Sequence, residues 1–346
     1  MKKFFAILLC AIMVLAVVAC DTGAKEAEYK LGMGVVVSMD SSKTGNAQVD
    51  ATVATVVTDA DGKIVACRID VAQNKMNVAN GAVDTAKVFE TKMELGTRYN
   101  MSAYGSDNNG DGIVLEWDAQ TKIFEEYVVG MTAAEVEAIE LQEVNAHMIA
   151  VDSELLTAGC TMQITDFMTA IVKACNDEQG MSFKAAEGSF TLGVAATSTA
   201  ADSKAATADT NGTVAMYSDF AATVVVDGVV VAALNDAIQP KITINAAGEI
   251  VDTAFKGTKR ELKEGYNMAA FGSDNDGDGR VLEWYVQSAE FSKYVVGKTA
   301  AEIAALETEE VNAHFVSTDD ALISAGCTMQ ITGIMVVVAQ AANNAR

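Results

Sequence analysis

Basic residues are scarce in this chain. Its 346 residues include 24 Lys and Arg but 47 Asp and Glu, which gives a net charge of −23. Nucleic-acid phosphates are bound by clustered Lys and Arg, so this balance argues against a nucleic-acid partner. It is compatible with cation binding and with solubility outside the cell.

Catalytic motifs are absent as well. The chain has two histidines and no Ser-His-Asp order, HExxH, P-loop or GxGxxG in the required context. None of the six cysteines has the CxxC spacing of a redox pair or zinc site. Cys67 and Cys175 are either a disulfide or buried free thiols. We therefore do not favour an enzyme.

The first twenty residues have the pattern of a targeting segment. Lys2 and Lys3 precede an apolar run over 4–18, and the run ends in Val-Val-Ala-Cys. This ending resembles a bacterial lipobox, which implies cleavage before Cys20 and a diacylglycerol on its sulfur. An uncleaved anchor and an ordinary secretory signal are the alternatives. No second long apolar run follows, so we expect a lipid-anchored extracytoplasmic protein with a short tether at 21–28.

An internal repeat organises the rest of the chain. Residues 91–175 match 258–342 without a gap, at an offset of 167. Strand patterns precede helix patterns in each copy, which predicts an α+β fold. We expect two tandem homologous domains, 29–176 and 191–346, each an antiparallel sheet followed by helices, with a polar linker at 177–190.

Local patterns give the expected elements of the first copy. Alternating apolar residues predict strands at 31–38, 51–58, 63–71 and 144–151. Helical periodicity predicts helices at 115–129 and 164–175. Thr132 and Glu135 form a capping box that predicts a further helix start, repeated at Thr299. The Ala/Ser/Thr/Asp run at 197–213 is typical of an extended loop.

Each copy contains an Asp/Asn/Gly loop with the oxygen spacing of an EF-hand or dockerin-type calcium site. Gly112 permits the sharp bend at the sixth position. The second copy has Tyr285 at the twelfth position, so Glu283, like Glu116 in the first copy, is a candidate to close the site instead. The candidate calcium ligands are Asp107, Asn109, Asp111, Ile113 (carbonyl) and Asp118 in the first loop, and Asp274, Asp276, Asp278, Arg280 (carbonyl) and Glu283 in the second. A solvated acidic turn is the alternative.

A second repeated motif is Ala-Gly-Cys-Thr, at 158–161 and 325–328. Small residues ahead of a helix N-terminus present amides that suit a phosphate group. The segment DALISAGCT, at 320–328, is similar to the Asp-x-x-Ser-Gly-Ala-Thr signature of FMN-binding domains, small extracytoplasmic α+β modules. The resemblance implies a flavin site at Gly159, Cys160, Thr161, Gly326, Cys327 and Thr328, with FMN esterified to the threonines. The alternative is a tight strand-to-helix turn with Cys and Thr packed inside.

Other repeated residues are less specific. His147 and His314 are either packed or solvated strand residues or ligands, and Trp117 and Trp284 fit the apolar face of a helix. Two Asp/Gln pairs recur, Asp70 with Gln73 and Asp236 with Gln239. They either hold the end of a hairpin or line a pocket.

Two functions follow as expectations. The first is a lipoprotein that binds FMN or another phosphate-bearing ligand, with calcium-stabilised loops and a role in electron transfer. The second is a calcium-binding surface-interaction or solute-binding lipoprotein without a redox cofactor. The chain is also similar to clostridial-type repeat lipoproteins in its GMG, DGKI and YVVGKT segments, a likeness that brings no firm activity.

Overall fold

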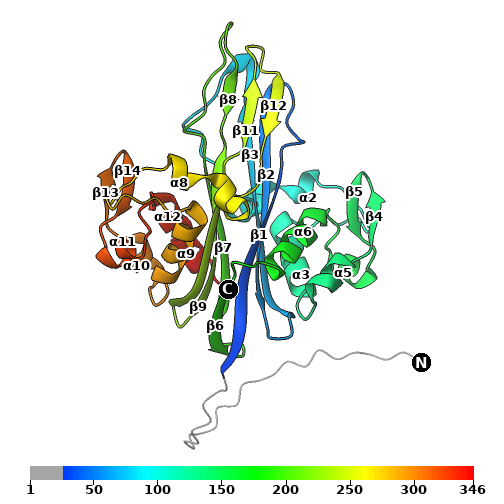
Figure 1. Ribbon diagram of the computed structural model, residues 1–346. Coiled ribbons are helices and arrows are strands. Elements are labelled where there is room, and N and C mark those ends of the chain that lie inside the picture. The colour runs from blue at the N-terminus through cyan, green and yellow to red at the C-terminus, as the bar shows by residue number, and fades with distance from the viewer. Residues whose placement is uncertain (1–25) are drawn as a thin grey trace, which may run out of the picture.

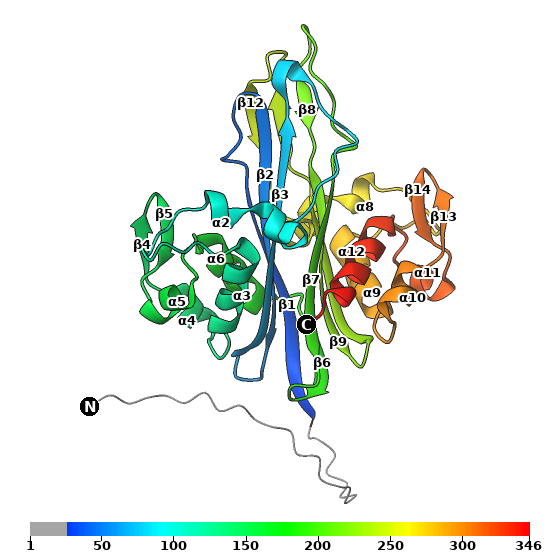
Figure 2. The same cartoon turned by 180° about the vertical axis from the view of Figure 1, so that it is seen from behind.

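A computed structural model describes residues 26–346 and has an α+β fold with antiparallel sheets. Figures 1 and 2 show two central sheets face to face, with one group of helices outside each sheet. The expected signal peptide and the acylated Cys20 lie outside the described residues, as does most of the tether. Within 26–346, no helix has both the length and the apolar content needed to cross a membrane.

The strands fall into three larger sheets and two hairpins. The first sheet has the order β3 (Ile64–Asn77), β2 (Asn46–Thr58), β1 (Glu26–Ser38), β6 (Met181–Ala186). The second has β10 (Val229–Ile238), β9 (Tyr217–Val226), β7 (Thr191–Thr199), and the third β12 (Ile250–Ala254), β11 (Lys241–Ile244), β8 (Gly212–Val214). The hairpins are β4 (Leu141–Val144) with β5 (His147–Ala150), and β13 (Thr308–Val311) with β14 (His314–Ser317).

The helical part of the first unit recurs in the second at the offset of 167. The first unit has α1 (Lys92–Leu95), η2 (Gly96–Tyr99), α2 (Met101–Tyr104), α3 (Trp117–Tyr127), α4 (Ala133–Glu137), α5 (Ser153–Ala158) and α6 (Thr165–Cys175), after a turn of 3-10 helix, η1 (Ala79–Gly81). The second has α7 (Lys259–Leu262), η3 (Lys263–Tyr266), α8 (Met268–Phe271), α9 (Trp284–Tyr294), α10 (Ala300–Ala304), α11 (Asp320–Ser324) and α12 (Thr332–Asn343).

Both faces of each central sheet are buried, which explains the nearly continuous apolar strands. Leu31 and Val49 on the inner face of the first sheet belong to the same buried cluster as Val194 and Phe220 of the second. The two units therefore share one core between their sheets. The opposite face of each sheet packs against that unit's own helices, as Val56 does in the first unit.

The segment expected to be a linker belongs to the first sheet. Within 177–190, strand β6 pairs antiparallel with β1, from Glu26 opposite Ala186 to Leu31 opposite Met181. Asp177 in the same segment forms a buried ion pair with Arg260 of α7, at 3.0 Å. This segment thus ties the two units together. Alternation in MSFKAA is too short to distinguish a strand from a linker by sequence alone.

Several local expectations change in the structure. The strand predicted at 144–151 is a hairpin, because Asn145 and Ala146 adopt positive φ (50° and 63°) and turn the chain. Pro240 separates β10 from β11, whereas the equivalent β3 is continuous. Cys67 and Cys175 are free thiols. The predicted helices at 115–129 and 164–175 correspond to α3 and α6.

Helices α6 and α12 pack closely on glycines of the underlying strands. A Cβ atom at Gly32 would lie 1.9 Å from the carbonyl oxygen of Ala174, and one at Gly193 would lie 1.9 Å from that of Ala341. Only glycine permits this approach of helix to strand. It fixes the position of each C-terminal helix, and α12 in turn forms one wall of the site described next.

Candidate functional site

Each acidic loop is held in shape by its first aspartate. Asp107 accepts hydrogen bonds from the amides of Gly110 (2.8 Å) and Gly112 (3.0 Å). Asp274 accepts the equivalent bonds from Gly277 and Gly279 (2.8 and 3.1 Å). The second glycine of each loop has φ above +80°, a conformation that glycine adopts without strain. Both loops therefore have the same folded shape.

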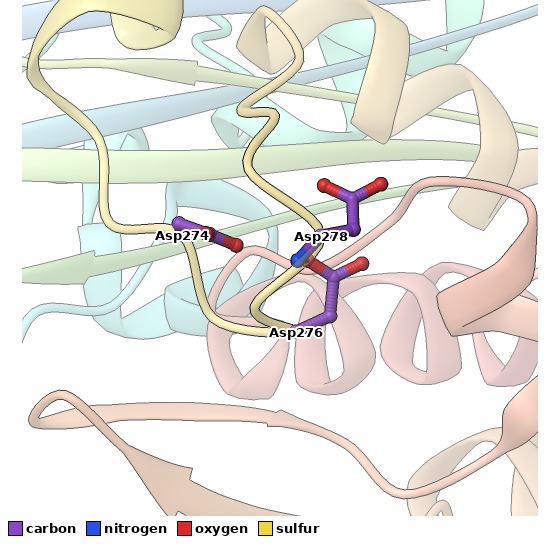
Figure 3. A group of neighbouring side chains, drawn as sticks. All are labelled: Asp274, Asp276 and Asp278. Carbon is purple, nitrogen blue, oxygen red and sulfur yellow. Dashed lines mark hydrogen bonds between the residues drawn. The ribbon is translucent and has the colours of Figure 1, made fainter.

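The carboxylates of the second loop gather at one point. Oxygens of Asp274, Asp276 and Asp278 lie within 4.8 Å of one another, and Figure 3 shows all three projecting from the same loop. Arg280 donates to Asp278 from its guanidinium (2.7 and 2.9 Å), and this hydrogen bonding lowers the pKa of Asp278. A bound cation in this loop would compete with Arg280 for that carboxylate.

The first loop differs at three positions. Asn109 replaces an aspartate, and its side-chain amide donates to Asp111 at 2.9 Å. Ile113 occupies the position of Arg280 and is 60% exposed, so no cation competes for Asp111 there. Asp118 lies in the first turn of α3 and keeps a carboxylate at the twelfth position. The first loop thus keeps the twelfth-position carboxylate in its sequence, whereas within the described residues the only cluster of three carboxylates is that of the second loop.

The carboxylate of Glu283 points to the start of α8 and not to the acidic loop. It accepts the amides of Met268 (2.9 Å) and Ala269 (3.2 Å), so it caps the start of α8. Glu116 caps α2 in the same way, through the amide of Met101 at 2.8 Å. The hydroxyl of Tyr285 donates to Glu264 (2.8 Å) and not to the loop. Glu283 is therefore a structural cap and is not available to close the second loop.

The loops are bonded to the other repeated motifs. The side-chain amide of Asn108 donates to the carbonyl of Thr161 at 2.8 Å, and its oxygen accepts from Asn145 at 3.0 Å. The second unit repeats both bonds with Asn275, Thr328 and Asn312. Acidic loop, hairpin turn and Ala-Gly-Cys-Thr segment therefore meet at one point in each unit.

The Ala-Gly-Cys-Thr segment is the end of a short helix and not the start of the next one. Gly159 caps the C-terminus of α5 with φ of +104°, and α6 begins only at Thr165. The amide of Cys160 donates to Leu155, and that of Thr161 donates to the side chain of Gln120 at 2.9 Å. In the second unit the amides of Gly326, Cys327 and Thr328 are engaged with Ile323, Leu322 and Gln287.

These contacts bear directly on the flavin expectation. The amides that would hold a phosphate already donate inside the protein, and Thr161 and Thr328 are only 2% and 6% exposed. Burial also raises the pKa of the Cys160 and Cys327 thiols to about 12. In this structure the motif has the geometry of a packed turn, the alternative that the sequence left open. It offers neither a phosphate cradle nor an accessible threonine hydroxyl.

A cavity of about 650 Å³ lies beside the turn in the second unit. Its walls come from the outer face of β9 and β10, the segment from η3 to the acidic loop, the turn of the β13–β14 hairpin and the start of α12. Trp284, Tyr266 and Phe271 give it an aromatic side, and Phe271 is 85% exposed at the mouth. The volume lies in the usual range for small-molecule sites.

The first unit has a smaller cavity of about 330 Å³ in the equivalent place. The residues shared by the two cavities are Gln73 and Gln239, Tyr99 and Tyr266, Asn100 and Asn267, Met101 and Met268, Tyr104 and Phe271, Gly105 and Gly272, Ser106 and Ser273, Asn108 and Asn275, His147 and His314, Met162 and Met329, and Gln163 and Gln330. The histidines and the glutamines left undecided by sequence therefore line cavities. Asp70 and Asp236 accept hydrogen bonds from the first turns of α1 and α7, and Asp70 also lines a separate cavity of about 250 Å³.

Two opposite charges face the larger cavity. Lys259 holds its ammonium 4.9 Å from the ring centre of Tyr266 and 5.1 Å from that of Trp284. Asp219, on the outer face of β9, also lines the cavity. Burial raises the pKa of Asp219, and the charge of Lys259 partly opposes that shift. No sequence pattern points to Asp219, because it lies in a strand outside the gap-free repeat.

The size difference has a local cause. A Cβ atom at Gly333 of α12 would lie 2.4 Å from Oδ2 of Asp219, so the absence of a side chain makes room for that carboxylate. At the offset of 167, the first unit has Asp166 in place of Gly333 and Thr52 in place of Asp219. The pKa of Asp166 is raised by burial and by the charge of Asp50. A protein carboxylate thus fills this region of the first unit.

Comparison with known proteins adds no family: no family model matches the chain, and no curated protein or solved structure resembles it.

Proposed function

We propose that this protein is a lipid-anchored, extracytoplasmic solute-binding protein whose ligand occupies the cavity of the second unit. The observation that carries the proposal is that both units have a cavity lined by repeat-equivalent residues. Two cavities lie at equivalent positions, and residues conserved between the two copies line both of them. Packing alone does not require a Tyr-Asn-Met segment, a histidine and a Met-Gln pair to surround an empty space twice.

The proposal is tested by screening for ligands with a matched variant. Thermal shift of the purified protein against polar metabolites should yield stabilising compounds. The same compounds should fail to stabilise Gly333→Asp, which places the first unit's carboxylate into the cavity next to Asp219. Equal stabilisation of both proteins would place binding elsewhere. Flavin absorbance of the protein from its native host would favour the redox function instead.

Calcium is part of the same proposal. The loops supply walls of the cavities through Asn108 and Asn275, and those asparagines also hold the hairpin and the packed turn. A calcium ion bound by the loop oxygens would therefore stiffen one side of each cavity. By linkage, calcium should strengthen solute binding, and the solute should strengthen calcium binding.

Calorimetry tests the metal sites separately. We expect heat of calcium binding in the wild type, and a larger loss in Asp107→Ala/Asp111→Ala than in Asp274→Ala/Asp278→Ala. The reason is that Arg280 already forms an ion pair with Asp278, whereas in the first loop Ile113 takes the place of this arginine. No heat in the wild type would remove calcium from the account.

The membrane anchor is tested in the bacterial host. Wild-type protein should fractionate with membranes and carry a lipid on Cys20, and Cys20→Ala should prevent acylation. An unmodified N-terminus beginning elsewhere than Cys20 would contradict this part of the proposal.

A further inference from the structure

We propose that the cavity of the second unit recognises a zwitterion, an amino acid or short peptide with an apolar side chain. Asp219 binds the ligand's ammonium group and Lys259 binds its carboxylate. This inference rests on the proposed function and specifies the ligand's chemistry. The first unit is not expected to bind the same ligand.

Asp219 supplies the anionic side. It lines the cavity and is half-buried, and within residues 26–346 no side chain or amide donates a hydrogen bond to it. A half-buried carboxylate without protein donors is open to charged N–H groups of a ligand, which form strong charge-assisted hydrogen bonds. Asp202, an exposed residue at the same cavity, adds a second negative charge near the mouth.

Lys259 supplies the cationic side. Its ammonium rests against the faces of Tyr266 and Trp284, and in the described part of the chain no carboxylate lies within ion-pair distance of it. The two rings hold the charge in place and leave its remaining donors unpaired. Because a cation already covers these ring faces, they are closed to a purely cationic ligand. A ligand with an anionic group beside its ammonium fits both charges.

Part of the remaining wall is apolar, beside polar residues such as Gln239, Asn275 and Gln330. Met268, Met329 and Ile334 line the cavity together with the aromatic residues, and the cavity of about 650 Å³ is larger than the charged ends of a zwitterion require. An apolar side chain on the ligand would bury itself against these residues. Phe271, exposed at the mouth, would cover it there.

The first unit lacks the same arrangement. Lys92 occupies the place of Lys259, with its ammonium 4.9 Å from the ring centre of Tyr99, but Asp166 introduces a protein carboxylate near it. Thr52 replaces Asp219, and the carboxylate that this strand places near Asp166 is that of Asp50, two residues away. The remaining cavity lies between the hairpin and α2 and is about half as large.

Isothermal titration calorimetry with glycyl-L-phenylalanine and L-phenylalanine tests the inference. Phenethylamine and 3-phenylpropanoate serve as matched probes, because each retains the ring and one of the two charges. We expect a zwitterion to bind, and each single-charge analogue to bind at least tenfold more weakly, the usual effect of losing a charge-assisted hydrogen bond in a desolvated site.

Variants assign the two contacts. Asp219→Asn should weaken zwitterion binding at least tenfold but leave 3-phenylpropanoate binding nearly unchanged. Lys259→Met should also weaken zwitterion binding at least tenfold, but leave phenethylamine binding nearly unchanged. Lys259→Met keeps an apolar chain over the two rings, and thermal unfolding monitors the fold of each variant. Asp166→Gly in the first unit should leave the affinity unchanged.

The outcomes separate this inference from the proposed function. The inference is overturned, and solute binding stands, in either of two cases. The single-charge analogues bind as tightly as the zwitterions, or a solute of another class binds the wild type but not Gly333→Asp. If no zwitterion binds and no screened solute distinguishes wild type from Gly333→Asp, both are overturned.

Discussion

Asp70 makes the stability of this protein depend on pH in an unusual direction. It is 3% exposed and accepts the amides of Val71 (2.7 Å) and Met93 (3.1 Å), which fixes the start of α1. Burial nevertheless outweighs these bonds and raises the pKa of Asp70 from an ordinary 3.8 to about 6. The folded protein thus keeps a proton that the unfolded chain has already lost.

The sign and size follow from this difference. A folded-state pKa above the unfolded value means that stability falls as pH rises from about 4 to about 6 and is constant above that. A shift of roughly two pH units corresponds to about 3 kcal/mol. Asp70→Asn keeps an acceptor for both amides and has no charge. Its free energy of unfolding relative to wild type should therefore increase by about 3 kcal/mol between pH 4 and pH 7.

Urea unfolding at several pH values, followed by circular dichroism, measures the difference. Asp236→Asn is the matched variant, because burial also raises the pKa of Asp236 to about 6. Asp61→Asn, in the exposed turn between β2 and β3, is the control for removal of a surface carboxylate. A difference between Asp70→Asn and wild type that is independent of pH would refute the reasoning.

Three further predictions concern other parts of the molecule. Asp177→Ala should lower the free energy of unfolding by about 3–5 kcal/mol, because Arg260 is left buried without its partner, and adding Arg260→Met should recover part of that loss in urea titrations. Ala146→Gly and Ala313→Gly, at positions with φ of 63°, should each raise stability by about 1 kcal/mol in the same assay. Zwitterion affinity, measured by calorimetry, should fall on acidification, because protonation removes the charge of Asp219. The fall should begin at a higher pH than the titration of an ordinary aspartate, because burial raises the pKa of Asp219.

Much of the fold could be predicted because its signals are local. Capping boxes at Thr132 and Thr299 start helices where the sequence indicates, and periodicity located α3 and α6. The sequence predicts one strand at 144–151 instead of the hairpin at 141–150, because Asn145 and Ala146 form a turn without the glycine that usually marks it. The pairing of β6 with β1 is a long-range contact, and no pattern within 177–190 announces it.

The site was predicted less well, for a related reason. Acidic-loop spacing located the loops, but Glu283 is engaged by amides of α8, which its sequence position does not reveal. The amides of the Ala-Gly-Cys-Thr segment bond within α5 and to residues of α3 and α9, so a site that looked open is closed. The cavity depends on Asp219 and Gly333, which lie 114 residues apart in the chain and meet only after folding.

Tryptophan fluorescence tests the central claim most directly, because the chain has one tryptophan in each unit. Trp284 lines the larger cavity, and Trp117 is buried at the equivalent position of the first unit. In Trp117→Phe, glycyl-L-phenylalanine should change the emission of Trp284 in a saturable way, and in Trp284→Phe the emission of Trp117 should stay constant. A saturable change from Trp117 alone, or from neither tryptophan, would contradict a zwitterion site in the second unit.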